Sequence, residues 1–551
     1  MEKRIIIAFI LSFGVLYVFR ALYIPPANTP KSVNTVDQPS VPLGGVPPGT
    51  APVAASTNAA IPLTEGKGET SATPSVDIQA EKAEDVAFDT ALYTATISNV
   101  GGVLKSYKLK AYSDAEGHPT ELINETGARK LGWPLSIVTS DAALNQALAK
   151  ANFVVHQETD GISLEFAANG FYAKKNYRFN KENYEFSLET KLTKDGKSVP
   201  RSVVWQGGFG DQKLPPDPAR QNAVYLVDMA FKRLALGSIK DQQAFTVNRV
   251  GVEDQYFLTM LLLPDSPVPV KVGKQEFPGA DGKPVATLFV SATLPEAKPV
   301  RIYLGPKDRQ WLGKDDPLLA SVVNYGWFEV IARPLLLALL FIHSYIGNFG
   351  WAIIILTTAL NFLLFPLRLK QQVSMQKMQK IQPQMKTLQD KYKKLKTADP
   401  RRAELQTEMM DLYKEHGVNP MGGCLPLLLQ MPVLIGFYSM LSVSIELRRA
   451  PWLWIADLSR PNFIILIIMA ISMIVLQKMT PTTVDPAQAK MMMIMPLMFT
   501  VMFYSQSSGL VLYWLTSNVL GIGQQVFINK YWSPHADAKL QARKPKQVHD
   551  K

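Results

Sequence analysis

The sequence predicts a polytopic α-helical membrane protein with six spans, a large antiparallel β-sandwich outside the cytoplasm and a cytoplasmic helical hairpin. Three observations lead to this fold class. Long apolar runs crowd the second half of the chain, short alternating runs fill residues 77–310, and a charged segment with heptad-like spacing separates two of the apolar runs. Helices of about 20 apolar residues are long enough to cross a bilayer.

Composition narrows the classes of partner and chemistry. The 551 residues have a formal net charge of +12, which indicates an anionic partner: nucleic acid, ribosomal RNA or acidic lipid headgroups. The single cysteine, Cys424, excludes an internal disulfide and a cysteine-based metal cluster. Because Cys424 opens an apolar run, a buried structural thiol is favoured over a nucleophile. We expect no cofactor and no metal.

Residues 1–24 form a predicted N-terminal transmembrane anchor. An apolar run from Ile5 to Phe19 follows Lys3 and Arg4, whose charges would hold the N-terminus in the cytoplasm. A signal peptide has a similar core, but no small-x-small cleavage site follows, so an uncleaved anchor is favoured. Residues 25–76 are rich in Pro, Ala and Thr and cannot bury enough apolar surface to fold, which predicts a flexible linker.

Residues 77–310 predict an antiparallel β-sandwich, because period-two runs recur at close spacing with turn signals between them. The clearest runs are 92–97, 153–155, 162–166, 184–188 and 285–290, and the turns include 99–102, 160–161, 194–196 and 281–282. His118 and His156 are isolated and lack metal-ligand spacing. The glycine-rich stretch 207–211 lacks the strand-to-helix context of a nucleotide loop and is typical of a turn. We therefore expect a binding or spacer domain.

The membrane half begins with an interfacial amphipathic helix region, residues 311–346. A five-span core follows over 347–530, with apolar runs at 347–367, 424–445, 462–478, 491–506 and 508–528. The last two runs form a tight hairpin around 505–509. Counting from a cytoplasmic N-terminus places the sandwich outside and the C-terminus inside. Most Lys and Arg residues agree with this orientation, although Arg448, Arg449 and Arg460 lie in an outer loop.

Residues 368–418 predict a cytoplasmic helical hairpin, bent at Pro383, whose second helix is capped by Asp399 with Pro400 at its first position. Residues 531–551 form a second basic segment on the same side of the membrane. A basic face is usually only solvated, but two such faces together favour contact with a ribosome or with anionic phospholipid. The residues predicted for this contact are Lys391, Lys393, Lys394, Arg401, Arg402, Lys544 and Lys546.

Polar residues inside the spans are costly to bury in hydrocarbon, and they occur in three of the five runs. Thr357 and Asn361 are four residues apart and share a helical face, and Gln430 and Asn518 lie in two other spans. Interhelical hydrogen bonding is the alternative for any single residue. Together they predict a shared hydrated cavity. Most of the 20 methionines follow residue 374, and flexible Met surfaces suit varied apolar partners.

Four motifs carry a family resemblance: Asn419–Pro426 followed by Gln430-Met431-Pro432, Gln477–Pro481, Ser508–Trp514 followed by Ser517-Asn518, and Ile342–Asn348. The chain resembles the YidC/Oxa membrane-protein insertases, specifically the Gram-negative YidC type. This resemblance implies a periplasmic β-supersandwich and a five-helix core in the bacterial inner membrane. The core would enclose a hydrophilic groove open to the cytoplasm and the lipid, into which the polar part of an incoming segment enters.

The resemblance implies a set of groove residues. They are Thr357, Thr358, Asn361, Gln430, Tyr513, Trp514, Ser517 and Asn518. One departure concerns charge: the family typically has an arginine five residues before the proline that corresponds to Pro366, and this sequence has Asn361 there. Arg368 lies nearly two turns further and could replace that arginine only in part. Trp514 stands where the family often has a tyrosine.

We therefore predict a membrane protein insertase and chaperone that inserts, folds and helps to assemble membrane proteins, alone or with the Sec translocon. The expected partners are nascent membrane proteins, Sec translocon subunits, the ribosome and anionic phospholipid, around a monomeric core. A transporter or channel is the first alternative, but it predicts buried ion pairs or internal repeats across the spans. A membrane-bound enzyme is the second, and only His343 lies near a span on the outer side.

Overall fold

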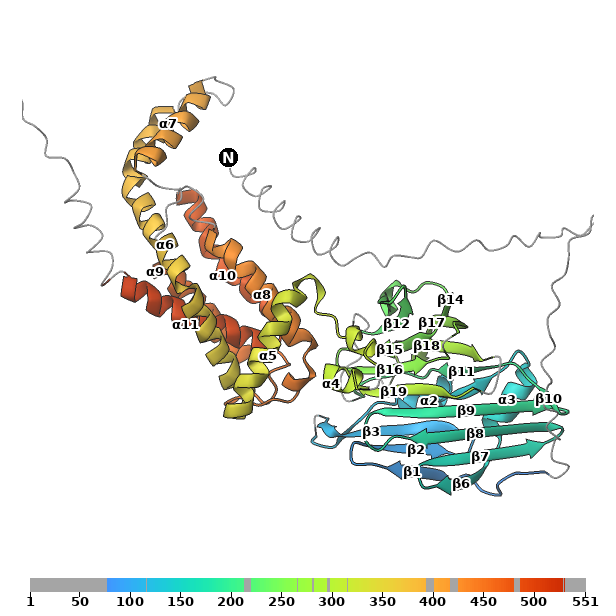
Figure 1. Cartoon of the computed structure of the whole chain (residues 1–551). Helices are drawn as coiled ribbons and strands as arrows, with labels where there is room; N and C mark the ends of the chain where they lie inside the picture. Colours follow the sequence, from blue (N-terminus) through green and yellow to red (C-terminus); the bar gives the residue numbers. More distant parts are fainter. Residues whose placement is uncertain are drawn as a thin grey trace, which may run out of the picture. The chain divides into compact units, whose positions relative to one another are not determined.

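The structure is a computed structural model (Figure 1). It describes residues 77–530 except 115, 213–219, 265, 280–281, 295–297, 315, 393–400, 417–424, 480–485 and 529. The predicted anchor, linker and basic tail, together with Cys424, Asp399 and Pro400, lie outside the described residues. The chain divides into two compact units between Gly305 and Pro306, the first built on β-sheets and the second on helices.

The first unit contains three sheets whose strands pair in antiparallel fashion. The smallest has the order β1-β2-β3-β4, the largest β13-β12-β15-β16-β19-β9-β8-β7-β6 with β10 beside β9, and the third β14-β17-β18-β11-β5. The strands are β1 (Asp85–Asp89), β2 (Tyr93–Ser98), β3 (Val103–Ser113), β4 (Pro119–Glu121), β5 (Ser136–Val138), β6 (Val154–Glu158), β7 (Gly161–Ala168), β8 (Phe171–Phe179), β9 (Glu185–Lys194), β10 (Lys197–Ser198), β11 (Arg201–Trp205), β12 (Asn222–Val227), β13 (Ala230–Ala235), β14 (Gln243–Val247), β15 (Arg249–Glu253), β16 (Phe257–Leu262), β17 (Val268–Pro278), β18 (Pro284–Leu294) and β19 (Val300–Pro306).

The core of this unit lies between the large sheet and the two smaller ones. Tyr107 of β3 stacks on Phe186 of β9, with ring centroids 6.2 Å apart. Tyr225 of β12 stacks on Phe245 of β14 at 4.4 Å. Aromatic side chains thus join each smaller sheet to the large one, and aromatic pairs add stabilisation beyond the area they bury. The predicted antiparallel strands are therefore present, arranged in packed layers.

Lys175 of β8 is a charged residue in this core, with only 1% of its surface exposed. Its Nζ donates to the carbonyl oxygens of Gly101 and Gly102, at 3.0 and 2.8 Å, and to that of Leu135, at 3.0 Å. Burial lowers the pKa of Lys175 to about 7. The lysine therefore fixes two turns of the chain onto the large sheet, and the Tyr177 hydroxyl, which donates to the Gly102 carbonyl at 2.8 Å, supports one of them.

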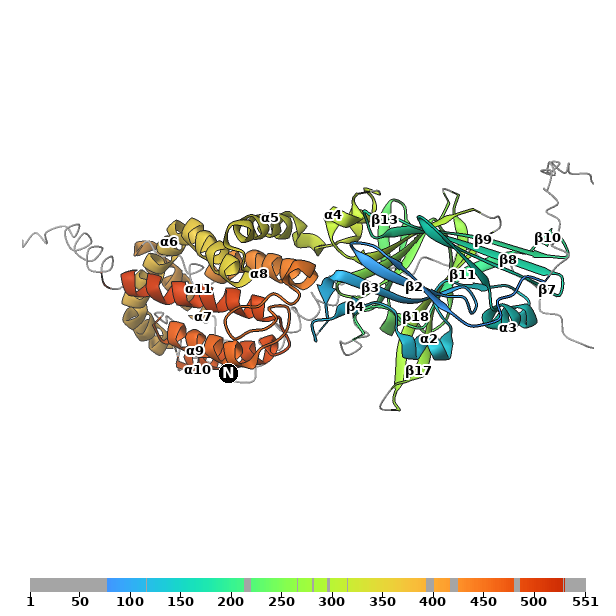
Figure 2. The same cartoon turned by 90° about the horizontal axis from the view of Figure 1, so that it is seen from below.

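Two short helices in the first unit were not predicted. They are α2 (Glu125–Leu131) and α3 (Ala142–Lys150). Asn124 caps the first by accepting from the Gly127 backbone, and Asp141 caps the second by accepting from Ala143 and Leu144. The capping residues Asn124 and Asp141 were the available sequence signals for these helices. Each helix is too short for its apolar residues to show a helical period. Figure 2 shows α2 beside β17, which it contacts.

The second unit is helical. Its α-helices are α4 (Arg309–Leu312), α5 (Glu329–Ile346), α6 (Phe349–Tyr392), α7 (Arg401–Glu415), α8 (Leu425–Val443), α9 (Phe463–Met479), α10 (Pro486–Phe503) and α11 (Ser508–Phe527), with 3-10 turns at Leu319–Val322, Gly326–Phe328 and Ile445–Leu447. Each of the five predicted apolar runs thus contains a helix. The tight hairpin predicted between the last two runs separates α10 from α11.

Two described helices are long and apolar enough to cross a membrane: Glu329–Ile346 and Phe349–Leu369. Three further apolar helices are shorter: Gln430–Val443, Phe463–Met479 and Ile494–Phe503. The first of the long helices, α5, was predicted to lie in the interface, yet it has the length and composition of a span. Six spans thus remain a prediction.

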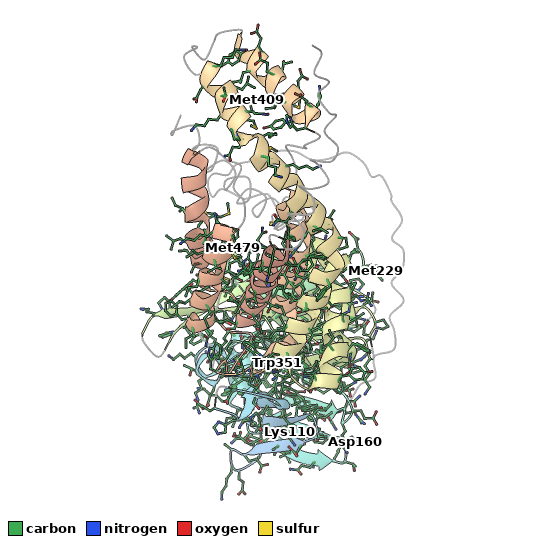
Figure 3. The ribbon with its side chains drawn as sticks, turned by 90° about the vertical axis from the view of Figure 1, so that its left-hand side faces the viewer. Lys110, Asp160, Met229, Trp351, Met409 and Met479 are labelled. Atoms are coloured by element: carbon green, nitrogen blue, oxygen red, sulfur yellow. The ribbon has the colours of Figure 1, made fainter. Side chains whose placement is uncertain are left out.

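Helix α6 differs from the predicted layout, because the second span and the first arm of the hairpin are one helix. It passes through Pro366 and Pro383 and continues to Tyr392. Beyond it, α7 packs back against α6, where Tyr392 donates to the Glu408 carboxylate at 2.9 Å. Figure 3 shows Met409 of α7 at one end of the helical unit and Trp351 of α6 at the other.

The loop between α8 and α9 closes the end of the helical unit where α6 begins. Trp452 of this loop packs edge-on against Trp351, with ring centroids 5.8 Å apart. A Cβ atom added to Gly350 would lie 2.1 Å from the Trp452 ring. The backbone of Gly509 donates to the Leu458 carbonyl at 2.8 Å, which ties the start of α11 to the same loop. A glycine at 350 is thus what lets the loop approach α6.

Candidate functional site

The best-defined polar cluster of the helical unit joins α6, α8 and α11 through Arg368. The Nη1 atom of Arg368 donates to Asn361 Oδ1 at 2.5 Å, and its Nη2 atom donates to Gln430 Oε1 at 2.8 Å. Gln430 Nε2 in turn donates to the Tyr513 hydroxyl at 2.6 Å. Four side chains from three helices therefore form one connected hydrogen-bond chain.

The helical repeat explains how Arg368 reaches this place. Asn361 and Arg368 are seven residues apart, about two turns, so they share one face of α6. Thr357 lies on the same face; its hydroxyl donates to the Ile353 carbonyl, and Asn361 Nδ2 donates to the Thr357 carbonyl. Phe362 and Leu363, on another face, are 69% and 74% exposed. The helix thus separates a polar face from an apolar one.

The charge of this cluster is not neutralised within it. Both acceptors of the Arg368 guanidinium are amide oxygens, and no carboxylate of the described residues forms an ion pair with Arg368. The arginine is half-buried between helices, where water screens its charge only in part. The two amide oxygens accept from two of its five N–H groups and bring no negative charge, so the positive charge can still attract an anionic group.

Tyr513 provides the wall of the cluster on α11. Its ring stacks on Phe437 of α8, with centroids 4.1 Å apart and planes at 19°. Ser517 follows Tyr513 by one helical turn and shares its face. This stacking fixes the direction of the Tyr513 hydroxyl, so the hydrogen bond from Gln430 meets a positioned oxygen.

Three predicted groove residues are directed elsewhere. Trp514 packs against Phe499 and Phe503 of α10, with centroids 5.5 and 5.2 Å apart. Asn518 donates to the Ser472 hydroxyl of α9 at 2.9 Å, and Thr358 donates to the Ile354 carbonyl of its own helix. Trp514 and Asn518 thus make contacts between helices, the alternative left open for such residues, whereas Thr358 is bonded within α6 as Thr357 is. The structure thus brings together Asn361, Gln430 and Tyr513 with Arg368.

A second polar contact lies one turn beyond Arg368 along α6. Gln372 donates to the side-chain oxygen of Gln525 on α11. Sequence reasoning gave Arg368 and Gln372 no definite place in the site. The signal that could have included them is the spacing 357, 361, 368 and 372, which continues a single helical face. The polar face of α6 therefore runs from Thr357 toward the hairpin.

The predicted basic contact residues are described only in part. Lys391 is exposed near the end of α6 and donates to Glu408 at 3.3 Å. This hydrogen bond raises the pKa of Lys391. Arg401 and Arg402 form the first turn of α7, although their side chains lie outside the described part of the chain. The others, Lys393, Lys394, Lys544 and Lys546, lie outside the described residues.

His118, predicted to be isolated, lies in the β3–β4 turn beside two carboxylates. Its Nδ1 atom is 3.9 Å from Asp114 and 3.7 Å from Glu116. The prediction of an isolated histidine was therefore wrong. Asp114 also accepts from the backbones of Glu116 and His118, at 2.9 Å each, so this carboxylate organises the turn. His118 itself is largely exposed, and a surface turn is the sufficient explanation.

Comparison with known proteins identifies the family. Residues 341–535 match the model of the 60Kd inner membrane protein, and residues 85–338 match that of the YidC periplasmic domain. A curated protein of Geotalea daltonii, "Membrane protein insertase YidC", is 35% identical, with 96% of this chain and 99% of that protein covered. Its namesake from Citrifermentans bemidjiense is 36% identical with the same coverage.

A crystal structure of an active YidC insertase with its first transmembrane domain resolved covers 84% of this chain and 95% of its own. It is 19% identical, with a TM-score of 0.35. The assignment therefore depends on the sequence relatives. The chain belongs to the YidC family of bacterial inner membrane proteins, which have a periplasmic domain.

Proposed function

We propose that this chain is a membrane protein insertase and chaperone, and that Arg368, Asn361, Gln430 and Tyr513 form its polar substrate site. The single observation that carries the site is the hydrogen-bond chain from Asn361 through Arg368 and Gln430 to Tyr513. The name of its full-length relatives, membrane protein insertase, supports the function.

The proposed mechanism follows from the cost of moving polar groups through hydrocarbon. Each unsatisfied backbone or side-chain group costs several kcal/mol in the bilayer core. A polar face on α6 that continues from Thr357 toward Gln372 would give the translocating segment partners along part of that path. Its apolar helix would meanwhile leave toward lipid along exposed side chains such as Phe362 and Leu363.

Arg368 would supply the electrostatic part of this mechanism. Position 361, where the family typically has arginine, is an uncharged asparagine in this chain. The guanidinium of Arg368, two turns further along α6, donates a hydrogen bond to the side chain of Asn361 and so lies beside that position. The proposal therefore gives Arg368 the role of attracting acidic residues of the substrate.

The first test compares Arg368→Gln with Arg368→Lys in the full-length protein. The substrates are two versions of one small membrane protein, whose translocated tail contains either aspartate or asparagine. We expect Arg368→Gln to slow insertion of the acidic version about tenfold, or ~1.4 kcal/mol, and Arg368→Lys to slow it less. The asparagine version should change little. Equal loss with both substrates would show that Arg368 serves only the fold.

The second test separates an insertase from a transporter or channel. Photo-crosslinking probes at Asn361, Gln430 and Tyr513 should capture a stalled nascent membrane protein. Probes at Phe362 and Leu363, on the exposed face of α6, should instead report lipid or the apolar helix of the substrate. If no probe at the polar positions captures nascent chain, the insertase site is not here and a transporter becomes the better hypothesis.

The remaining partners and the topology belong to the same proposal. We propose six spans, with both termini in the cytoplasm and the β-sheet unit in the periplasm. The basic face of the α6–α7 hairpin and the tail of residues 531–551 would contact the ribosome or anionic phospholipid. The protein would act alone or with Sec translocon subunits as a monomeric core. If ribosomes co-purify with the protein and Lys391→Glu abolishes this co-purification, the result would support a ribosome contact on the hairpin.

A further inference from the structure

The β-sheet unit contains a hollow of about 440 Å³ on the outer face of the five-stranded sheet. Its floor is formed by alternate residues of β17, β18 and β11, and its wall by residues 138–140 and Pro200. The opposite face of the same strands, with Val272 and Val290, is fully buried in the core. Small-molecule sites typically have volumes of ~300–1,000 Å³, so the hollow is large enough to hold a ligand.

Hydroxyl and amide groups line the floor. Ser202 of β11 and Thr293 of β18 are paired across the sheet, with their hydroxyl oxygens 2.9 Å apart. Gln275 of β17 also lines the hollow, and its side-chain oxygen is buried without a hydrogen-bond partner among the described residues. Its amide can exchange hydrogen bonds with a ligand hydroxyl once the side chain turns toward the hollow. The floor thus offers both donors and acceptors.

Phe289 adds a flat apolar surface among these polar groups. It is paired in register with Gly273, and a Cβ atom added to that glycine would lie 2.3 Å from the phenyl ring. The ring therefore lies across the glycine, along the floor of the hollow, instead of standing up from the sheet. Covering a strand glycine is one use of such a ring. It also leaves an aromatic surface between rows of hydroxyl groups.

The charge of the lining is positive. Lys271 is exposed at one side of the hollow. Arg201 lies at its edge, but its guanidinium points into the core, where its Nε atom donates to the Thr190 hydroxyl at 2.7 Å, so Lys271 supplies the positive charge that a ligand can reach. No aspartate or glutamate is among the lining residues that the structure describes. An anionic ligand is therefore favoured over a cationic one.

We propose that this hollow binds an acidic saccharide. A sugar ring would lie against Phe289 through its C–H groups, and its hydroxyls would exchange hydrogen bonds with Ser202, Thr293 and Gln275. Its carboxylate would pair with Lys271. An extended peptide fits less well, because peptides that add to sheets use an unpaired strand edge, and the floor here is a sheet face whose central strands are already paired on both sides.

The test uses the purified full-length protein in detergent and two disaccharides that differ by one carboxylate. The acidic probe is N-acetylglucosaminyl-N-acetylmuramic acid, and the neutral probe is chitobiose; calorimetry measures both affinities. We expect the acidic probe to bind about tenfold more tightly, equivalent to ~1.4 kcal/mol. Lys271→Gln should abolish that difference, whereas Lys274→Gln, on the same strand but outside the lining, should preserve it.

A second variant tests the aromatic floor. Phe289→Ala should weaken both disaccharides about tenfold or more without lowering the unfolding temperature by more than a few degrees. Lack of binding by either disaccharide, or affinities that neither Lys271→Gln nor Phe289→Ala changes, would overturn the proposal. Capture of an unfolded peptide instead of sugar, lost with Phe289→Ala, would overturn it as well. Insertion activity should be unaffected by all three variants, so the result is independent of the groove.

Discussion

At the residue scale, the role proposed for Arg368 would mean that a side-chain function has moved along a helix while its place in space is kept. A long guanidinium can reach back toward a residue two turns away, because both lie on one face of α6. The side-chain oxygen of Asn361 accepts a hydrogen bond from the Arg368 guanidinium. The positive charge therefore lies next to position 361, where an arginine at 361 would also have placed one. The site depends on Gln430 in the same way, since this amide links the arginine to α11.

Gln430 therefore offers a way to separate charge from packing. Gln430→Glu should form an ion pair with Arg368, preserve the fold and reduce insertion of acidic substrates several-fold. Gln430→Leu leaves Tyr513 and one side of Arg368 without their partner and should destabilise the protein by about 1–3 kcal/mol. Thermal unfolding in detergent and insertion assays on both variants check this. Normal insertion by a stable Gln430→Glu protein would contradict the electrostatic role.

Lys175 gives a pH dependence to the β-sheet unit. Because its pKa is lowered in the folded state to about 7, the unfolded chain binds a proton that the folded chain releases above that pH. Stability should therefore rise between about pH 7 and pH 10, by at most ~1.4 kcal/mol per unit. Hydrogen exchange of the β8 amides in the full chain measures this. Lys175→Met should remove the slope and lower protection throughout, because the Gly101 and Leu135 carbonyls lose their lysine donor, while Gly102 keeps the Tyr177 hydroxyl.

The sequence identifies which residues inside the spans are polar, but it does not specify the direction of each side chain. Spacing places Thr357, Asn361 and Arg368 on one face, which is a property of the helix alone. Whether Trp514 faces the site or α10 depends on how two helices pack, and no local pattern specifies that. The pairing of His118 with Asp114 likewise results from a turn whose closure is not visible in residue spacing.

At the scale of elements, alternation located β2, β6, β7, β9 and β18, since a half-buried strand imposes a period of two on its own sequence. The order of those strands within the sheets could not be predicted from the sequence. Strand β9, for example, lies between β8 and β19, which are separated by more than 100 residues. Only tertiary packing decides such long-range neighbours. Helices α2 and α3 were missed because one or two turns contain too few residues to display a helical period.

The contact between α6 and the loop after α8 makes an element-scale prediction. Gly350→Ala places a methyl group against the Trp452 ring and should destabilise the helical unit by about 1–3 kcal/mol. Gly523→Ala in α11 is the matched control, because a Cβ atom there has no neighbour within 4 Å. That control should be neutral or stabilising by up to ~1 kcal/mol. Equal unfolding temperatures for the two variants would mean that the loop is free to move away.

At the scale of the whole molecule, the proposed topology puts the β-sheet unit and the hairpin on opposite sides of the membrane. In a Cys424→Ser background, cysteine at Asp160 should react with a membrane-impermeant maleimide in spheroplasts. Cysteine at Lys391 should react only after the membrane is permeabilised. Both sites are exposed, so access and not burial decides the outcome. Labelling of both cysteines from outside would rule out the proposed orientation.

The length of α6 has a mechanical consequence. At about 1.5 Å per residue, its 44 residues extend for about 66 Å, roughly twice the hydrocarbon thickness of a bilayer. Arg368 lies near the midpoint, and the hairpin forms one end of the same rod. A ribosome or other partner that pushes on the hairpin would therefore displace Arg368 directly, because one continuous helix joins them without a loop. Pro366, two residues before Arg368, is the nearest position at which this helix can bend.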